Sequence, residues 1–258
     1  MLRGKLVGKG HGFKASGFRL RGAGEVSRIE ALSDAVFGFA ITLLVVSLEV
    51  PKTFGELMHA MHGFVAFAIS FVLLFLVWYT QYSFFRRYGL QDSVTILLNA
   101  VLLFVILFYV YPLKFVWTLV VNQFMRVPSG VARPDGTFEP AVTSEQAPTM
   151  MIIFGAGYVA VFVVFVLLYA HAYRQRRRLE LNELETFDTR GEIEQNSLNV
   201  AVGLFSICLA VYGGTRYTPL AGMSYMLLGP LLTAHGFYTG RRRRKLERRI
   251  NDAGDADA

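Results

Sequence analysis

The carboxylate of Asp34 lies inside a long apolar run, where an ionisable side chain needs a structural or functional reason. It lies about 10 Å beyond the basic start of that run, given a helical rise of ~1.5 Å per residue. An ionised acid at the centre of a membrane helix costs roughly 2.5–3.5 kcal/mol, and somewhat less nearer the helix end. We therefore expect Asp34 either to lie at the membrane rim or to be paired and functional.

Polar residues of other apolar runs lie at a similar depth from the same membrane face. Trp78 of the second run and Asn99 of the third share the level of Asp34, Asn199 of the fifth lies near it, and Gln81 is slightly shallower. Because polar side chains at one depth can satisfy one another, we expect a shared network. The alternative is that Trp78 belongs to the interfacial aromatic belt and that the asparagines make isolated helix contacts.

Other residues form no catalytic or metal-binding pattern in the sequence. The five histidines show metal-like spacing only at His59-x-x-His62, which is a weak pair. The single cysteine, Cys208, excludes an intramolecular disulfide and is expected to be a small packing residue. A glycine-rich phosphate loop and a Ser-His-Asp set are also missing from the sequence. The sequence therefore predicts a protein that is not an enzyme and that holds no cofactor and no resident metal.

The elements that must position Asp34 are membrane helices, because 53% of the 258 residues are hydrophobic and only 17% are charged. Six apolar runs approach the ~20 residues that a membrane span needs. They cover residues 27–50, 60–84, 93–118, 148–172, 195–213 and 217–239. The predicted fold class is an all-α membrane protein with six transmembrane helices. Its transmembrane domain is 27–239, between an arm (1–26) and a tail (240–258).

The basic residues predict the orientation of these spans. Of the 26 Lys and Arg residues, 21 lie on one side of the expected membrane. By the positive-inside rule both termini are cytoplasmic, and an even number of spans independently requires them to share a side. We expect a multi-pass protein of the cell inner (plasma) membrane.

Both terminal segments are basic. The arm is glycine-rich and has no apolar core, so we expect it to be flexible and not a signal peptide. Ser27 and Glu30 have the spacing of a capping box at the start of the first span. The tail begins with the basic run 241–249 and ends in acidic residues; beside a membrane helix such a run is typical of contact with anionic lipid headgroups, not with nucleic acid.

The residues around Asp34 resemble a known family signature. The pattern Arg28-x-x-x-Leu32-Ser33-Asp34, followed eight residues later by Thr42, resembles that of the transmembrane protein 175 family of potassium channels, which is Arg-x-x-x-Phe-Ser-Asp. The similarity extends to Ser70, Trp78, Leu98, Asn99 and Pro112. It covers the first half of the chain well, and the second half only through span number and topology.

The resemblance implies a homotetramer in which the first span of each subunit lines a central pore. The apolar constriction of the family then falls on Phe39, Leu43 and Val46, and its pore-lining threonine falls on Thr42. The family also implies a structural network that fixes the pore helix without touching the ion. Together with the depth argument, that network comprises Arg28, Ser33, Asp34, Trp78 and Asn99.

Three departures from the family pattern affect the expected function. Leu32 replaces the usual Phe, Phe39 replaces a usual Ile or Leu, and Gln81-Tyr82 stand where relatives often carry a His pair. A ring of Phe39 side chains would change how firmly an apolar constriction closes or which ion it prefers. The predicted function is a passive channel permeable to K⁺. The alternatives are a secondary transporter, or a membrane scaffold without transport activity.

Overall fold

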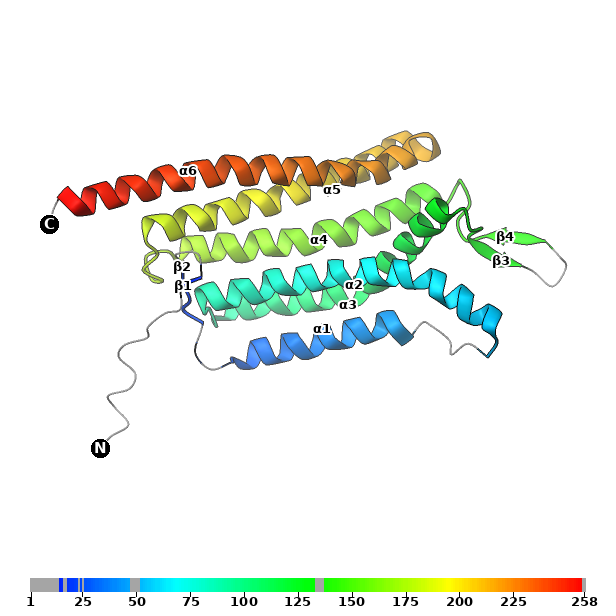
Figure 1. Ribbon diagram of the computed structural model, residues 1–258, viewed down its shortest axis with the longest axis horizontal. Coiled ribbons are helices and arrows are strands. Elements are labelled where there is room, and N and C mark those ends of the chain that lie inside the picture. The colour runs from blue at the N-terminus through cyan, green and yellow to red at the C-terminus, as the bar shows by residue number, and fades with distance from the viewer. Residues whose placement is uncertain are drawn as a thin grey trace, which may run out of the picture.

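The computed structural model is an elongated bundle of long helices that run along one common direction (Figure 1). It describes residues 14–15, 18–22, 24, 26–46, 52–132 and 137–256. The helices are α1 (Arg28–Val46), α2 (Phe54–Tyr88), α3 (Ser93–Met125), α4 (Ala147–Arg174), α5 (Glu183–Met223) and α6 (Leu228–Ala256), with a 3-10 turn, η1 (Ser224–Leu227), before α6. Two antiparallel ribbons accompany them: β1 (Lys14–Ala15) with β2 (Phe18–Arg19), and β3 (Gly130–Ala132) with β4 (Phe138–Pro140).

The all-α membrane class is confirmed by these helices. Within the described residues, four helical stretches are long and apolar enough to span a membrane, namely Gly63–Tyr88, Ser93–Met125, Ala147–Arg174 and Glu183–Ile250. The helix α1 has 19 residues, of which three are charged, and is not among these four. Six separate spans therefore remain a prediction.

Several helices continue beyond the predicted apolar runs. The helix α3 passes through Pro112 and ends only at Met125, because a membrane environment preserves helices around proline better than water does. The helix α6 continues through the basic run to Ala256, since Arg, Lys and Glu are good helix formers in water. The segment 119–147, which lies between the third and fourth predicted runs, holds the end of α3 and the β3–β4 ribbon.

The chain reverses direction inside the segment assigned to α5. Gly214 has φ 53° and ψ −145°, which no other residue type adopts without strain. Beyond it the chain runs back along α5, as three side-chain contacts show: Ser206 to Ala221, Glu194 to His235, and Asp188 to Arg243. The reversal falls between residues 213 and 217, where the sequence predicts the boundary between the fifth and sixth spans.

The helix packing leaves α1 at one edge of the bundle. The helix α4 packs extensively on α5 and also on α3, whereas α1 lies against α2 and α3 (Figure 1). Near the ends of α2 and α4, the rings of Phe84, Tyr88 and Tyr169 form a buried edge-to-face cluster. This cluster joins the two halves of the chain close to the point where α1 begins.

Part of the amino-terminal arm is folded onto the bundle, contrary to the flexible arm that its glycines predict. Phe18 is only 3% exposed and meets the ring of Tyr88 edge-on at 5.6 Å. Arg21 forms an ion pair of 2.7 Å with the buried carboxylate of Glu185 at the start of α5. The number of glycines did not predict how this segment is held. Phe18 packs on the bundle, and the buried carboxylate of Glu185 needs the cation that Arg21 provides.

The reversal at Gly214 gives a direct test of this hairpin. We expect Gly214→Ala to destabilise the protein by roughly 1–3 kcal/mol, because a side chain strains the positive-φ backbone. Thermal unfolding in detergent measures the change. Gly229→Ala is the matched control, since a Cβ there meets nothing within 4 Å. Equal midpoints for the two variants would contradict a glycine-dependent reversal.

Candidate functional site

The start of α1 is fixed by the predicted capping box. The backbone N–H of Glu30 donates to Ser27 Oγ at 3.2 Å, and the backbone N–H of Ser27 donates to Glu30 Oε2 at 2.9 Å. These two bonds satisfy donors that a helix start leaves without partners inside the helix. The first turn of α1 is therefore held by its own sequence.

One stripe of α1 is buried against the rest of the chain. It consists of Ser33, Phe37, Ala40 and Leu44, all of which are at most 2% exposed. Their spacing of four, three and four residues follows a single helix face. On the other side of the helix, Ala35 and Thr42 are exposed and Phe39 is 57% exposed. Although most residues of α1 beyond Asp34 are apolar on every side, the helix has one partnered face and one face without a partner among the described residues of this chain.

Asp34 accepts a hydrogen bond from an aromatic side chain of α2. The indole Nε1–H of Trp78 donates to Asp34 Oδ1 at 2.8 Å. The indole ring lies between two other rings of α2, with its centroid 5.1 Å from Phe75 and 5.4 Å from Tyr82. Because these neighbours limit how the ring can turn, the direction of the N–H donor is fixed and orients Asp34.

Ser33, the residue before Asp34, joins α1 to α3 and through it to α2. Asn99 Nδ2 donates to Ser33 Oγ at 3.0 Å, and Gln81 Nε2 donates to Asn99 Oδ1 at 2.9 Å. The Ser33 hydroxyl in turn donates to the carbonyl of Ile29 at 2.8 Å. Ser33, Gln81 and Asn99 are all buried. An apolar environment makes such a chain of bonds costly to break, because each buried polar group would lose its partner.

The far end of α1 also has a partner from α3. Lys114 Nζ donates to the carbonyl of Leu44 at 2.7 Å. The last carbonyls of a helix have no partners inside the helix, and a cation is favourable beside them. The helix α1 is therefore held at both ends as well as along its buried stripe.

The predicted site residues fall into different positions. Thr42 is exposed, and its hydroxyl donates to the carbonyl of Phe39 at 2.7 Å. Leu43 is half-buried and packs against the core, so it borders the exposed face. The side chain of Val46 lies outside the described residues. Arg28 is exposed, and no hydrogen bond or ion pair holds it within the described part of the chain.

Two other candidates lie apart from this site. Asn199 does not join the Asp34 layer: its Oδ1 accepts from Tyr158 at 2.6 Å, and its amide donates to the carbonyl of Gln195. The expected depth was a weak criterion here, because α4 supplies a nearer partner. His59 and His62 lie on α2, but their side chains are outside the described residues. Within the described part of the chain, no group of three His, Cys, Asp or Glu residues could hold a metal ion.

Sequence reasoning missed the clamp that precedes α1. Arg21 donates to Glu185 Oε2 at 2.7 Å and to the carbonyl of Leu179 at 2.8 Å. Gly22 and Arg86 exchange two hydrogen bonds, one in each direction. The chain is thus tied to α5 and to the end of α2 shortly before α1 starts. The one available sequence signal was the Asn182-x-x-Glu185 capping box, which is present.

The start of α3, which carries Asn99, is fixed by a polar cluster around Asp92. Asp92 accepts from Thr95 at 2.7 Å and lies 2.7 Å from His171 Nε2 of α4. Burial by itself would raise the pKa of Asp92, but the hydrogen bond from Thr95 and the contact with His171 outweigh it. The pKa of Asp92 is therefore below its usual value, and the residue stays ionised at neutral pH.

Comparison with known proteins extends this site to a family. The family model of the endosomal/lysosomal potassium channel TMEM175 matches residues 28–109, which contain the whole cluster around Ser33 and Asp34. A protein of Marivirga tractuosa named as a potassium channel is 40% identical over 232 residues, covering 89% of this chain and 93% of the relative. This chain belongs to the TMEM175 family. A potassium channel of Streptomyces collinus is 34% identical over 88 residues, covering 32% of this chain and 43% of that protein.

The fold comparison agrees and corrects the extent of the resemblance. A crystal structure of a variant of the potassium channel MtTMEM175, in complex with a Nanobody-MBP fusion protein, matches with a TM-score of 0.74 at 38% identity. The match covers 89% of this chain and 99% of that chain. The TMEM175 similarity therefore includes most of the second half of the chain, which the signature residues alone could not show. The chain is accordingly a membrane protein of a channel family.

The buried amide chain of this TMEM175 member gives the second prediction. We expect Asn99→Leu to lower the free energy of unfolding by about 1–2 kcal/mol, because it leaves the amide of Gln81 buried without its acceptor. Titration with a denaturing detergent measures the loss. Adding Gln81→Leu should recover part of it, since both polar groups are then gone. A loss in the double variant equal to the sum of the two single losses would show that the two amides are not coupled.

Proposed function

We propose that this chain is a subunit of a passive, potassium-permeable channel whose pore is lined by α1. The supporting observation is that α1 has two different faces. Four buried residues hold one face, while Phe39 and Thr42 on the other face are exposed and pack against no core residue within the described part of the chain. The relatives are named as potassium channels, and we therefore propose K⁺ as the permeant ion. The TMEM175 family is a channel family, so an enzymatic activity has no support.

A pore on this face requires more than one subunit. Because α1 lies at the edge of the bundle against α2 and α3, one copy cannot surround an axis. Rotational symmetry places the same face of each copy around a common centre. We propose a homotetramer of six-span subunits in the cell inner membrane, with both termini cytoplasmic and the basic segments against anionic lipid headgroups. The 21 basic residues expected on one side support this orientation.

Phe39 would form the main apolar constriction in this assembly. It is 57% exposed, whereas Leu43 is half-buried and would border the constriction. Val46 would extend the constriction by one turn of the helix. An apolar ring selects ions by making them shed part of their water, and it closes when the ring dewets.

The hydroxyl oxygen of Thr42 would provide a polar position beside that ring where a cation can bind. Its hydroxyl proton is already donated to the carbonyl of Phe39. The oxygen lone pairs are consequently available as acceptors, which suits a cation and not an anion. Ser33 would not touch the ion in this arrangement, because its buried hydroxyl is bonded to Asn99 and to the carbonyl of Ile29. Asp34 would orient α1 through the bond of its Oδ1 to Trp78.

A secondary transporter is the alternative from a different class, and a non-conducting scaffold is a third. Transporters commonly carry broken helices at the membrane midplane of both repeated halves. Here the polar layer of Ser33, Asp34, Gln81 and Asn99 belongs to α1, α2 and α3 alone. Saturable uptake that depends on a counter-ion would favour the transporter.

Potassium flux into liposomes that contain purified protein tests the channel directly. We expect flux above that of empty vesicles, and a severalfold higher flux for Phe39→Ala, because the smaller side chain widens the ring. Phe104→Ala is the matched control, since Phe104 is 72% exposed on α3, and it should match the wild type. The proposal fails if neither the wild type nor Phe39→Ala conducts, or if both Phe variants change flux equally.

A further inference from the structure

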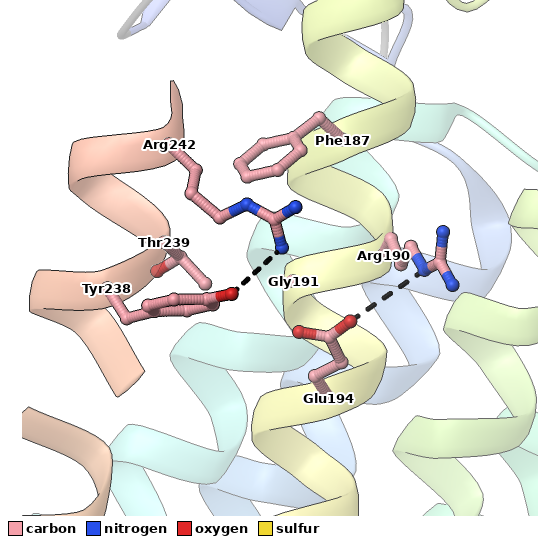
Figure 2. Close-up of a pocket in the computed structure, with 7 residues that line it drawn as sticks. All are labelled: Phe187, Arg190, Gly191, Glu194, Tyr238, Thr239 and Arg242. Atoms are coloured by element: carbon pink, nitrogen blue, oxygen red, sulfur yellow. Dashed lines mark hydrogen bonds and ion pairs between the residues drawn. The ribbon is translucent and has the colours of Figure 1, made fainter. Parts of the chain in front are cut away.

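A cavity of about 290 Å³ lies between α5 and α6, away from the helix that would line the pore. Figure 2 shows its walls, which come from two antiparallel helices. Its lining includes Phe187, Arg190, Gly191 and Glu194 of α5 with Tyr238 and Arg242 of α6. None of these residues takes part in the site described above. The cavity therefore needs a separate explanation.

The position of the cavity matches the phosphate level of a bilayer. On α5 the cavity precedes the apolar run 195–213, and on α6 it lies at the end of the apolar run 217–239 and just beyond it. Phe237 and Tyr238 are 70% and 58% exposed there, as expected of aromatic residues at a membrane interface. The basic run 241–249 begins directly after them.

The chemistry of the cavity walls suits an anion. The Arg242 guanidinium points toward α5 between the rings of Phe187 and Tyr238 (Figure 2), and it donates to the Tyr238 hydroxyl at 3.1 Å. A guanidinium has five N–H donors, so one such bond leaves others for a phosphate. Glu194 is the acidic residue in the lining, and its charge faces Arg190 at 3.7 Å and His235 at 3.3 Å.

We propose that this cavity binds the phosphate of an anionic phospholipid headgroup, with Arg242 as the main phosphate ligand and Arg190 in support. The ion pair between Arg190 and Glu194 is exposed, and exposed pairs of this kind are weak enough to exchange for a stronger anion. Gly191 borders open space in the cavity wall, because a Cβ built there meets nothing within 4 Å, so a large side chain at this position has room to fill the cavity. The bound lipid would then bridge α5 and α6 at the membrane surface. This site is independent of whether the protein conducts ions.

Native mass spectrometry of the purified full chain with dioctanoyl phosphatidylglycerol tests the proposal. Arg242→Gln removes the charge, and Gly191→Leu fills the cavity while every charge stays. We expect each to weaken binding at least fivefold. Arg249→Gln removes one charge from the same basic run outside the cavity and should change binding less than twofold. Thermal unfolding of each variant shows whether the fold is kept.

The outcomes separate a cavity from a diffuse basic surface. Equal weakening by Arg242→Gln and Arg249→Gln, with Gly191→Leu unchanged, would overturn the site. Inorganic phosphate and dioctanoyl phosphatidylethanolamine are the comparison ligands, and both should bind more weakly than the phosphatidylglycerol. Free phosphate that competes as strongly as the lipid would show a simple anion site, and equal binding of phosphatidylethanolamine would overturn the preference for a net negative headgroup.

Discussion

Two adjacent polar residues of α1, each bonded to a different helix, set the orientation on which the rest of this structure depends. Ser33 is bonded to Asn99 of α3, and Asp34 is bonded to Trp78 of α2. Neighbouring residues on a helix point about 100° apart, so two such bonds define both the position and the rotation of α1. Beyond Asp34 the helix is apolar on every side, so without these bonds it could turn about its axis with little change in buried apolar area.

With that rotation fixed, packing and function divide between two sides of one helix. Phe37, Ala40 and Leu44 continue the buried stripe that Ser33 begins, and Lys114 holds its far end. The exposed side, with Phe39 and Thr42, is then free to meet other copies of the chain. The clamp between Arg21 and Glu185 lies just before α1, so α5 is mechanically connected to the same helix. The second half of the fold is thus connected to the helix of the proposed pore.

Parts of this arrangement could be predicted from the sequence, and parts could not. Apolar length predicted the helices, and depth along them predicted that Asp34, Trp78 and Asn99 would lie at one level. Depth alone could not say that Asn99 bonds to Ser33 instead of Asp34, or that Asn199 bonds to Tyr158, because those pairings depend on helix rotation. The docking of Phe18 was hidden by a glycine-rich composition. The proposed pore face of α1 came only from the family resemblance, since the apolar residues of this helix show no periodicity that would reveal it.

Cross-linking at the exposed side of α1 tests the central claim most directly. In a Cys208→Ser background, Thr42→Cys is oxidised in native membranes and the products are separated on a denaturing gel, with Phe104→Cys on α3 as the comparison. If the bonds of Ser33 and Asp34 turn this side toward a shared axis, Thr42→Cys gives a covalent dimer at high yield and Phe104→Cys does not. A dimer from Phe104→Cys alone would contradict the account, because it would place α3 and not α1 at the contact between subunits.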